Sequence, residues 1–348
     1  MIPEILPERH SSPPQRVRVS VGIFAHNEGD LIAEAIEAFL GQDTRRTNIA
    51  EVIVVCCGCT DNTVEIVAKY VQHDSRVRLI VREEQAGKVA AINEFLAAAD
   101  SGTLVLSGGD VIPGLQLVEL LVRPMTQDPR CAMTGPRAVS APPRGLAATL
   151  HTLLWQLHHA VARRAPKLGE TIAVRRSFLP ACLPAGIHCD EVLIEWLILE
   201  HGGRLEYVTG ARVQNFPPRR IRHLYRQRRR IACQHAAAGR LLRYRPATSR
   251  LRNVLTALGE VAGADWRRAA VLAVLCTVEL AARFHGRIDF LRGRRYSTWR
   301  QAERQVWPEL PDGRPRRIAG QSGRGSRVKP LRLSFGNISA RSRWPGSR

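Results

Sequence analysis

A chain of 348 residues with 45% hydrophobic content can bury one large core or two small ones. Its eight cysteines lack the regular spacing of a disulfide framework, which excludes a small secreted disulfide scaffold. The 52 Lys and Arg against 31 Asp and Glu give a formal charge of +21, which suits polyanions, nucleotides and anionic membrane surfaces without choosing among them.

The chain begins with MIPEILPERHSSPPQR, and residues 1–16 are predicted to form a flexible lead. This start has no apolar signal core, and together with the cysteine pattern it predicts a reducing, cytoplasmic setting. A first strand is expected at 17–24, where an alternating sequence becomes wholly apolar. After the polar residues 26–28, apolar side chains at helical spacing predict an amphipathic helix over 31–40.

A second strand is expected at 52–55, an unbroken apolar run typical of a strand buried on both faces. Small and polar residues follow, and Thr60-Asp61-Asn62 supplies N-cap chemistry for a helix over 61–71. The alternation continues with a strand, a helix and a strand at 77–81, 87–99 and 104–106. This order predicts an α/β fold with a doubly wound, Rossmann-like, mostly parallel sheet flanked by helices.

The later part of the chain is mainly helical. Helices are expected at 146–164, 190–201 and 219–242, and strands at 169–175 and 205–208. The most apolar helix, 269–284, contains Glu279 and is shorter than the ~18–20 residues that a membrane span needs, so it is either a buried helix or an interfacial anchor. After Pro311, ten Lys or Arg stand against one acid, Asp312, in a segment that is predicted to be disordered.

Four polar clusters follow apolar strands or open helices: 26–28, 57–61, 108–110 and 190–191. Because the carboxyl ends of parallel strands share one edge, the first three are expected to converge there as a nucleotide site with a carboxylate for a metal. Taken singly, each is better explained as a cap or turn, and convergence is what favours a site. Cys56, Cys57 and Cys59 are predicted to be small residues of a tight strand-to-helix loop. The alternative is that they form half of a zinc site, but no second pair of ligands follows at metal-ligand spacing.

These clusters belong to a larger pattern. IFAHNE, VVCCGCTDNT, EEQAGKVAAIN, SGGDVIP, CDEVLIEWLILEHGGRLEYV and QRRRI occur in this order between residues 23 and 231. The series resembles a family 2 glycosyltransferase of GT-A fold over roughly residues 17–235, and it rests on six motifs, none of which is decisive alone.

The resemblance implies a nucleotide-sugar site in the loops after the first two strands, formed by His26, Asn27, Glu28, Cys57, Gly58 and Asp61. Cys56 and Cys57 stand where the family usually has acidic residues, so the resemblance does not predict which nucleotide base is bound. Lys88 matches a family element near the donor, where its charge complements phosphate. The D-x-D metal motif aligns with Gly108-Gly109-Asp110, which places Gly109 at the donor and leaves Asp110 as the carboxylate for Mg²⁺ or Mn²⁺.

The resemblance also implies a catalytic base in Asp190-Glu191. In an inverting transfer one carboxylate takes the proton of the acceptor hydroxyl, and Glu191 occupies that position with Asp190 as its close competitor. The alternative is that both acids simply complement a helix N-terminus. Gln227 and Arg230 fall where the family has Q-x-x-R-W, on the acceptor or diphosphate side, and the neighbouring arginines are expected to form a solvated face or touch anionic lipid.

Four regions are therefore predicted: a lead at 1–16, a GT-A domain at 17–242, a helical extension at 243–310 for which a membrane-interfacial position is one alternative, and a basic tail at 311–348. The predicted function is transfer of a sugar from a nucleotide-sugar to a hydroxyl acceptor, with inversion and a divalent metal. The acceptor is expected to be a glycan or a lipid-linked glycan of envelope polysaccharide or glycolipid synthesis. The enzyme is expected in the cytoplasm, peripherally docked on the anionic inner face of a membrane.

Two other functions are compatible with the sequence. Because acids are missing at Cys56, Cys57 and Gly108, the chain is alternatively a degenerate glycosyltransferase that binds a nucleotide-sugar without turnover. The charge of +21 also fits a nucleic-acid-binding protein. Only 5% of the residues are aromatic and no stacking motif lies among the arginines, so nucleic acid is the less favoured partner.

Overall fold

The computed structural model describes residues 16–294 and 296, so the predicted tail at 311–348 and nearly all of the predicted lead at 1–16 lie outside the described residues. The chain first alternates between strands and helices. These elements are β1 (Val17–Ala25), α1 (Ile32–Leu40), β2 (Thr47–Cys57), α2 (Thr63–His73), β3 (Val77–Arg82), α3 (Lys88–Ala98) and β4 (Thr103–Gly108). The predicted alternation of this half is confirmed.

The second half is less regular. It contains β5 (Val111–Pro113), α4 (Leu117–Gln127), β6 (Cys131–Ser140), α5 (Leu146–Ala162), β7 (Thr171–Arg175), α6 (Asp190–Glu200), β8 (Arg204–Asn215), α7 (Ile221–Leu242), α8 (Leu251–Ala262) and α9 (Trp266–Leu291). Two short 3₁₀ helices lie at Arg176–Phe178 and Ala247–Ser249. The sequence did not reveal β5, α4, β6 or α8, and β8 extends beyond the predicted 205–208.

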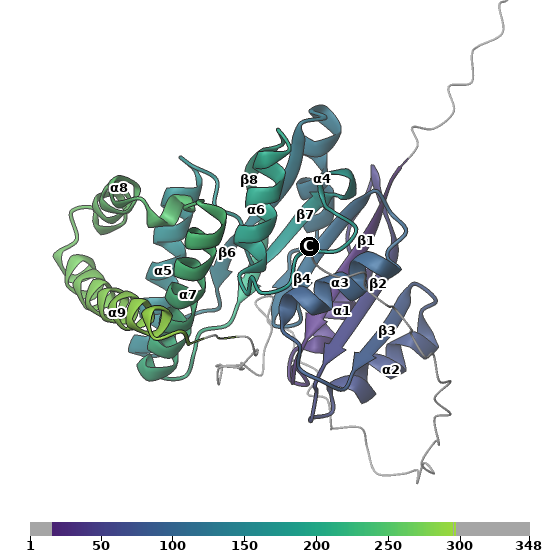
Figure 1. Cartoon of the computed structure of the whole chain (residues 1–348), viewed down its shortest axis with the longest axis horizontal. Coiled ribbons are helices and arrows are strands. Elements are labelled where there is room, and N and C mark those ends of the chain that lie inside the picture. The colour runs from purple at the N-terminus through teal and green to yellow at the C-terminus, as the bar shows by residue number, and fades with distance from the viewer. Residues whose placement is uncertain (1–15, 295, 297–348) are drawn as a thin grey trace, which may run out of the picture.

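All eight strands form one sheet in the order β3-β2-β1-β4-β7-β6-β8-β5. Strands β3, β2, β1 and β4 are parallel, as predicted, and β6 is parallel to β8. By contrast, β7 is antiparallel to both β4 and β6, and β5 is antiparallel to β8. The sheet is therefore parallel in its first half and mixed in its second, in an α/β fold with helices on its faces (Figure 1).

The two faces of the sheet carry separate hydrophobic cores. Because successive strand residues point to opposite faces, Phe24 joins the core under α3 and α6, whereas Ile23 and Ala25 join the core under α1, α2 and α4. Phe24 meets Phe95 of α3 edge to face, with ring centroids 6.0 Å apart. Gly22 makes room for this contact, because a Cβ there would lie 2.8 Å from the Phe95 ring.

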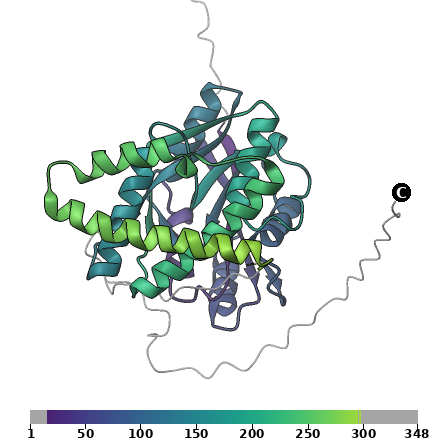
Figure 2. The same cartoon turned by 60° about the vertical axis from the view of Figure 1, so that its left-hand side comes forward.

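Helices α5, α7, α8 and α9 form a further layer with a third core, to which α5 contributes Leu150 and Leu153 and α9 contributes Leu272 and Leu275. Figures 1 and 2 show α8 and α9 lying over α5 and α7, away from strands β1 to β3. Helix α9 has 26 residues and is long and apolar enough to cross a membrane, with only 22% of its most apolar window buried. The prediction that this helix is too short for a span was therefore wrong, because it begins and ends beyond the apolar run at 269–284.

Candidate functional site

The loops after β1 and β2 are tied to each other at the carboxyl end of the sheet. The Asn27 side-chain oxygen accepts hydrogen bonds from the backbone N–H groups of Thr60 at 2.7 Å and Asp61 at 3.3 Å. Asp61 accepts from the backbone N–H of Gly29 at 3.0 Å and from that of Thr63, in the first turn of α2, also at 3.0 Å. Asn27 and Asp61 thus have the capping contacts expected of ordinary loop residues, at the edge where a nucleotide is predicted.

The same loops bury two of the predicted nucleotide residues. Cys57 has a fully buried side chain in the core, and only its carbonyl, 2.8 Å from Nδ1 of His26, reaches the loop. Glu28 is 2% exposed. The side chains of Cys57 and Glu28 are therefore buried in this structure, and their contact with a nucleotide stays a prediction. Gly58, with φ of 58°, occupies the left-handed region that glycine adopts without strain.

The cysteines of this loop behave as small core residues. Cys56 and Cys57 are buried, and burial raises the pKa of the Cys57 thiol to about 11. Hydrogen bonding to Cys56 lowers the pKa of the half-buried Cys59 to about 7. Within the described part of the chain, no group of three or more His, Cys, Asp or Glu side chains could hold a metal ion. The structure therefore favours a tight strand-to-helix loop over half a zinc site.

The loop after β4 carries the remaining predicted metal ligand. The Gly109 N–H donates to the Phe24 carbonyl at 2.9 Å, which keeps this loop against the end of β1. Asp110, which is half-buried, folds back over Gly108, so that a Cβ at Gly108 would collide with the Asp110 carboxylate. A single carboxylate is a sparse donor set, and it fits Mg²⁺ or Mn²⁺ when a bound diphosphate supplies further oxygens.

A charged pair joins the start of α3 to the start of α6. The Lys88 ammonium lies 2.9 Å from a carboxylate oxygen of Asp190. Burial acts to lower the pKa of Lys88, but Asp190 and Glu191 outweigh it and hold the pKa above its ordinary value. Lys88 is therefore a fixed positive charge, 24% exposed, beside the acidic pair.

The antiparallel strand β7 brings the acidic pair to the same edge. Ser107 at the end of β4 pairs with Thr171 at the start of β7, and their hydroxyls are 2.9 Å apart. The residues that enter β7 consequently lie beside the β4 loop. There the Glu170 N–H donates to Oε1 of Glu191 at 3.2 Å, and a Cβ on Gly169 would lie 3.1 Å from Oε2.

Three further residues support Glu191 and were not predicted from the sequence. Lys167 is buried, with its ammonium 3.8 Å from Oε2 of Glu191 and 3.1 Å from Oε1 of the fully buried Glu195. The Tyr244 hydroxyl donates to the other oxygen of Glu195 at 3.3 Å. Although burial opposes it, the pKa of Lys167 is raised by Glu195 and Glu191. The signal in the sequence was the spacing of Glu191 and Glu195, one helical turn apart among apolar neighbours.

The structure places Gln227 and Arg230 half-buried on α7. Their neighbours Arg228 and Arg229 form ion pairs with acidic residues of α9. The prediction of a solvated face was thus wrong for these two arginines, which hold α9 against α7 instead.

Residues 20–177 match the family model described as glycosyl transferase family 2. These residues therefore form a domain that matches glycosyl transferase family 2. The matched part of the chain includes the loops after β1, β2 and β4 and ends before the acidic pair at 190–191.

Two curated relatives of this chain match over part of their length. Glycosyltransferase AglD of Haloferax volcanii is 32% identical over 128 residues, which is 35% of this chain and 20% of that protein. Glycosyltransferase GlyG of Streptococcus pneumoniae serotype 4 is 31% identical over 103 residues, which is 30% of this chain and 33% of that protein. The chain therefore spans between a fifth and a third of these relatives.

The GT-A architecture of the chain is shared with a solved structure. A mannosyltransferase from Pyrobaculum calidifontis, solved in complex with GDP-Man and Mn²⁺, aligns with a TM-score of 0.56 and 21% sequence identity. The alignment covers 81% of this chain and 90% of that one, so the shared fold extends well beyond the matched family region.

Proposed function

We propose that this protein transfers a sugar from a nucleotide-sugar donor to a hydroxyl group of a glycan or lipid-linked acceptor, with inversion at the anomeric carbon. The observation that carries the proposal is the meeting of Lys88, Asp190 and Glu191 at the edge of the sheet that also holds the β4 loop. That edge combines positive charge for a diphosphate with a carboxylate for proton transfer.

On the donor side, the loops at 26–29 and 57–61 offer the nucleotide a rigid rim, because they are tied together through Asn27 and Asp61. Lys88 complements the negative charge of the diphosphate. Asp110 would hold a divalent cation, which when bound neutralises charge on the departing nucleoside diphosphate.

On the acceptor side, Glu191 is the proposed base. As the acceptor oxygen forms its bond to the anomeric carbon, Glu191 takes the hydroxyl proton, and the diphosphate leaves with the electron pair of the broken bond. Glu191 is 28% exposed and Asp190 only 14%, and Asp190 is engaged by Lys88 at 2.9 Å. The Glu170 N–H and Lys167 fix the Glu191 carboxylate, while its exposure leaves it open to an acceptor.

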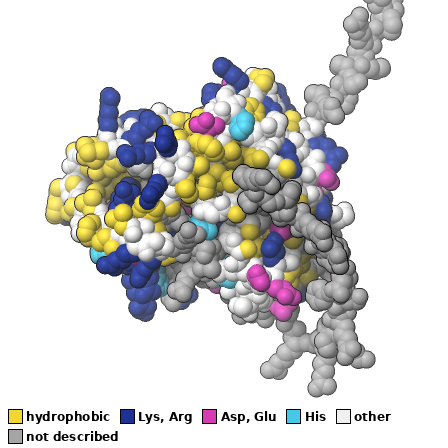
Figure 3. Space-filling model, in the orientation of Figure 1, with side chains coloured by type: hydrophobic (Ala, Val, Ile, Leu, Met, Phe, Trp, Pro, Cys, Tyr) yellow, Lys and Arg dark blue, Asp and Glu magenta, His cyan; other side chains and the backbone are white. Residues whose placement is uncertain are grey.

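We further propose that the enzyme works in the cytoplasm, docked on the inner face of a membrane. Support comes from the charge of +21 and from apolar side chains on the outer faces of α8 and α9, such as Leu251, Leu280 and Phe284, which are 71%, 68% and 65% exposed. Figure 3 shows hydrophobic side chains together with Lys and Arg on this part of the surface. Such a surface suits the boundary between lipid and water.

The decisive test is release of nucleoside diphosphate from a panel of nucleotide-sugars, with Mn²⁺ and with a chelator, for wild type and Asp110→Asn. We expect metal-dependent release from one donor and its loss in the variant. The absence of any donor binding would refute the proposal.

A degenerate binder is the second candidate, favoured by the buried thiols of Cys56 and Cys57 and by Gly108, where the family usually has acids. It would bind a donor in the same panel without releasing diphosphate, also when acceptor glycans are added.

A further inference from the structure

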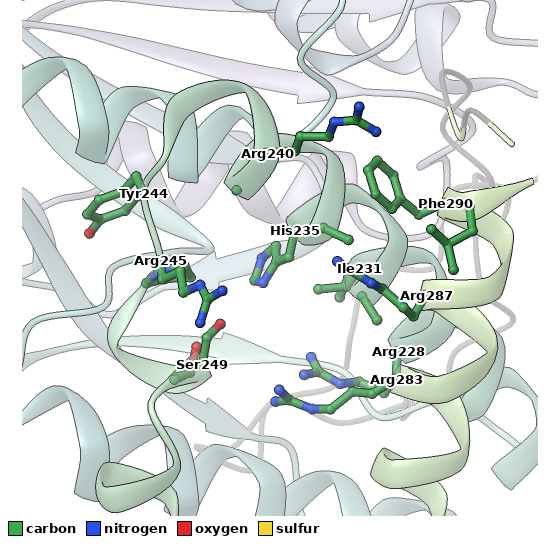
Figure 4. Close-up of a pocket in the computed structure, with 16 residues that line it drawn as sticks. Arg228, Ile231, His235, Arg240, Tyr244, Arg245, Ser249, Arg283, Arg287 and Phe290 are labelled. Carbon is green, nitrogen blue, oxygen red and sulfur yellow. The ribbon is translucent and has the colours of Figure 1, made fainter. Parts of the chain in front are cut away.

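A cavity of about 550 Å³ lies between α7, α9 and the segment 243–249, apart from the donor edge. Among the residues that the structure describes, five arginines and no acidic residue line it: Arg228, Arg240, Arg245, Arg283 and Arg287. Figure 4 shows His235 near the centre, with the guanidinium groups of Arg228, Arg245 and Arg283 directed toward the space around it. The chain thus gathers like charges from two helices and a connecting segment around one hollow.

The positive charge of this arginine pocket is only partly balanced. Arg228 and Arg283 both pair with one carboxylate, that of Glu279. Among residues 16–294 and 296, no carboxylate lies within ion-pair distance of Arg245 or Arg287. Burial, together with Lys167, Arg228 and Arg283, lowers the pKa of His235 to about 3, so the imidazole is neutral and adds no further cation at neutral pH. The pocket therefore has at least two guanidinium groups available to an anion.

An apolar stripe runs from the pocket along α9. Leu280, Phe284, Arg287 and Leu291 follow one another at spacings of four, three and four residues, which places them on one face of the helix. Their three apolar side chains are 68%, 65% and 70% exposed, and Leu291 also lines the pocket. A ligand with an anionic head in the pocket would thus have its apolar part beside this stripe.

We propose that the arginine pocket binds the phosphate head group of a membrane lipid, whose hydrocarbon chain lies along the exposed face of α9. Guanidinium groups bind phosphate through two parallel hydrogen bonds, which favours a terminal phosphate or diphosphate over a single buried carboxylate. The assignment to a lipid rests on the adjacent apolar stripe, because a free phosphate has no apolar part that could pack against it. This inference deepens the proposed function, because it specifies the membrane partner of the docking surface.

The test compares a pocket variant with a charge-matched control on the full chain. Arg245→Gln with Arg287→Gln removes two charges from the pocket, whereas Arg252→Gln with Arg268→Gln removes two charges from exposed positions on α8 and α9 outside it. Binding is measured by flotation with phosphatidylcholine vesicles that contain phosphatidic acid, and with pure phosphatidylcholine vesicles. Inorganic pyrophosphate and a short single-stranded RNA serve as soluble competitors.

We expect wild type to prefer the phosphatidic acid vesicles, the pocket variant to bind them about tenfold more weakly, and the control to change less than about twofold. Equal losses in both variants would mean diffuse charge and would overturn the proposal. So would binding of pyrophosphate without a preference for phosphatidic acid, or stronger competition by the RNA than by the phosphate. Donor binding, measured on the same samples without vesicles, reports on the proposed transferase separately.

Discussion

Glu191 and Asp190 are adjacent in the chain but have different partners, and this difference assigns their proposed roles. Asp190 is held by Lys88 at 2.9 Å, so its negative charge positions a cation at the proposed donor site. Glu191 receives a backbone N–H and faces Lys167 at 3.8 Å, and it is the more exposed of the two. A base needs an accessible oxygen, which favours Glu191.

The substitution Glu191→Gln tests this assignment, because the amide keeps the shape and the hydrogen bond from Glu170 but cannot take a proton. We expect kcat to fall by about 10²–10⁴-fold with the donor Kd unchanged. Steady-state kinetics and calorimetry with the donor measure the two quantities. In Asp190→Asn, by contrast, donor affinity should fall because Lys88 loses its partner. The reverse pattern would exchange the two roles.

At the scale of the element, the segment that enters β7 matters most for the proposed base. Gly169 touches Glu191 so closely that a Cβ would lie 3.1 Å from its Oε2. Glu170 has a φ of 64°, and its side chain accepts a hydrogen bond from Asn215 at 2.6 Å. The turn is thus shaped to receive the Glu191 carboxylate.

Gly169→Ala should therefore move the Glu191 carboxylate and lower kcat by about tenfold or more, since small displacements of a catalytic group are costly. The free energy of unfolding should change by no more than about 1 kcal/mol, because the added methyl group meets the end of a flexible side chain. Gly210→Ala is the matched control, as its Cβ would meet nothing within 4 Å. Unchanged kcat in Gly169→Ala would show that the close contact has no catalytic importance.

The attachment of α9 to α7 depends on a buried ion pair. Asp289 is fully buried and accepts from Arg229 at 2.6 and 2.7 Å and from the Tyr296 hydroxyl at 2.7 Å. The hydrogen bonds from Arg229 are the main cause that lowers the pKa of Asp289 to about 2. Because the folded pKa is below the ordinary value of 3.8, this stabilisation is present above about pH 4 and is lost as the pH falls toward 2.

Asp289→Asn should lower the free energy of unfolding by about 3 kcal/mol at neutral pH, because it leaves Arg229 without its carboxylate. The difference from wild type should shrink between about pH 4 and pH 2. Urea unfolding followed by circular dichroism measures both effects. Glu260→Gln, which breaks a more exposed pair with Arg163, should cost at most about 1 kcal/mol. Equal costs for the two variants would contradict the anchoring role of Asp289.

The sequence predicted the elements whose pattern is local. Val52 to Val55 and the capping residues after them give a strand, a loop and a helix without reference to the rest of the chain. It did not predict that β7 inserts antiparallel between β4 and β6, because its pairing with β4 joins segments more than 60 residues apart and its pairing with β6 joins segments about 40 residues apart. Lys167 was missed for the same reason, since only the folded chain brings it to Glu191 and Glu195.

At the scale of the whole molecule, the donor edge and the exposed helices belong to different layers. The sheet carries the proposed chemistry, and α8 and α9 carry the exposed apolar side chains (Figures 1 and 3). Apolar side chains on a helix are usually buried in a core. On α8 and α9 many of them lie at the surface instead, which is a feature of interaction sites.

Replacing Leu280 and Phe284 by Gln should reduce recovery of the protein in membrane fractions by at least about tenfold, because each buried apolar side chain contributes about 1.5–3 kcal/mol. Recovery of wild type should also fall as salt is raised, since arginines contribute to the attraction. Leu115→Gln is the control, because Leu115 is 65% exposed but lies before α4, outside the helical layer. Wild type that stays wholly in the supernatant at low salt would refute membrane docking.

The third hydrophobic core has a consequence for how the protein unfolds. Cooperativity follows from shared packing, and α8 and α9 share theirs with α5 and α7 rather than with the two cores of the sheet. The layer that is proposed to meet the membrane can therefore loosen as a unit of its own while β1, β2 and β4 keep their hydrogen bonds. Attachment to a membrane and release from it would then require local unfolding of this helical layer alone. The proposed donor edge of the sheet would stay folded throughout.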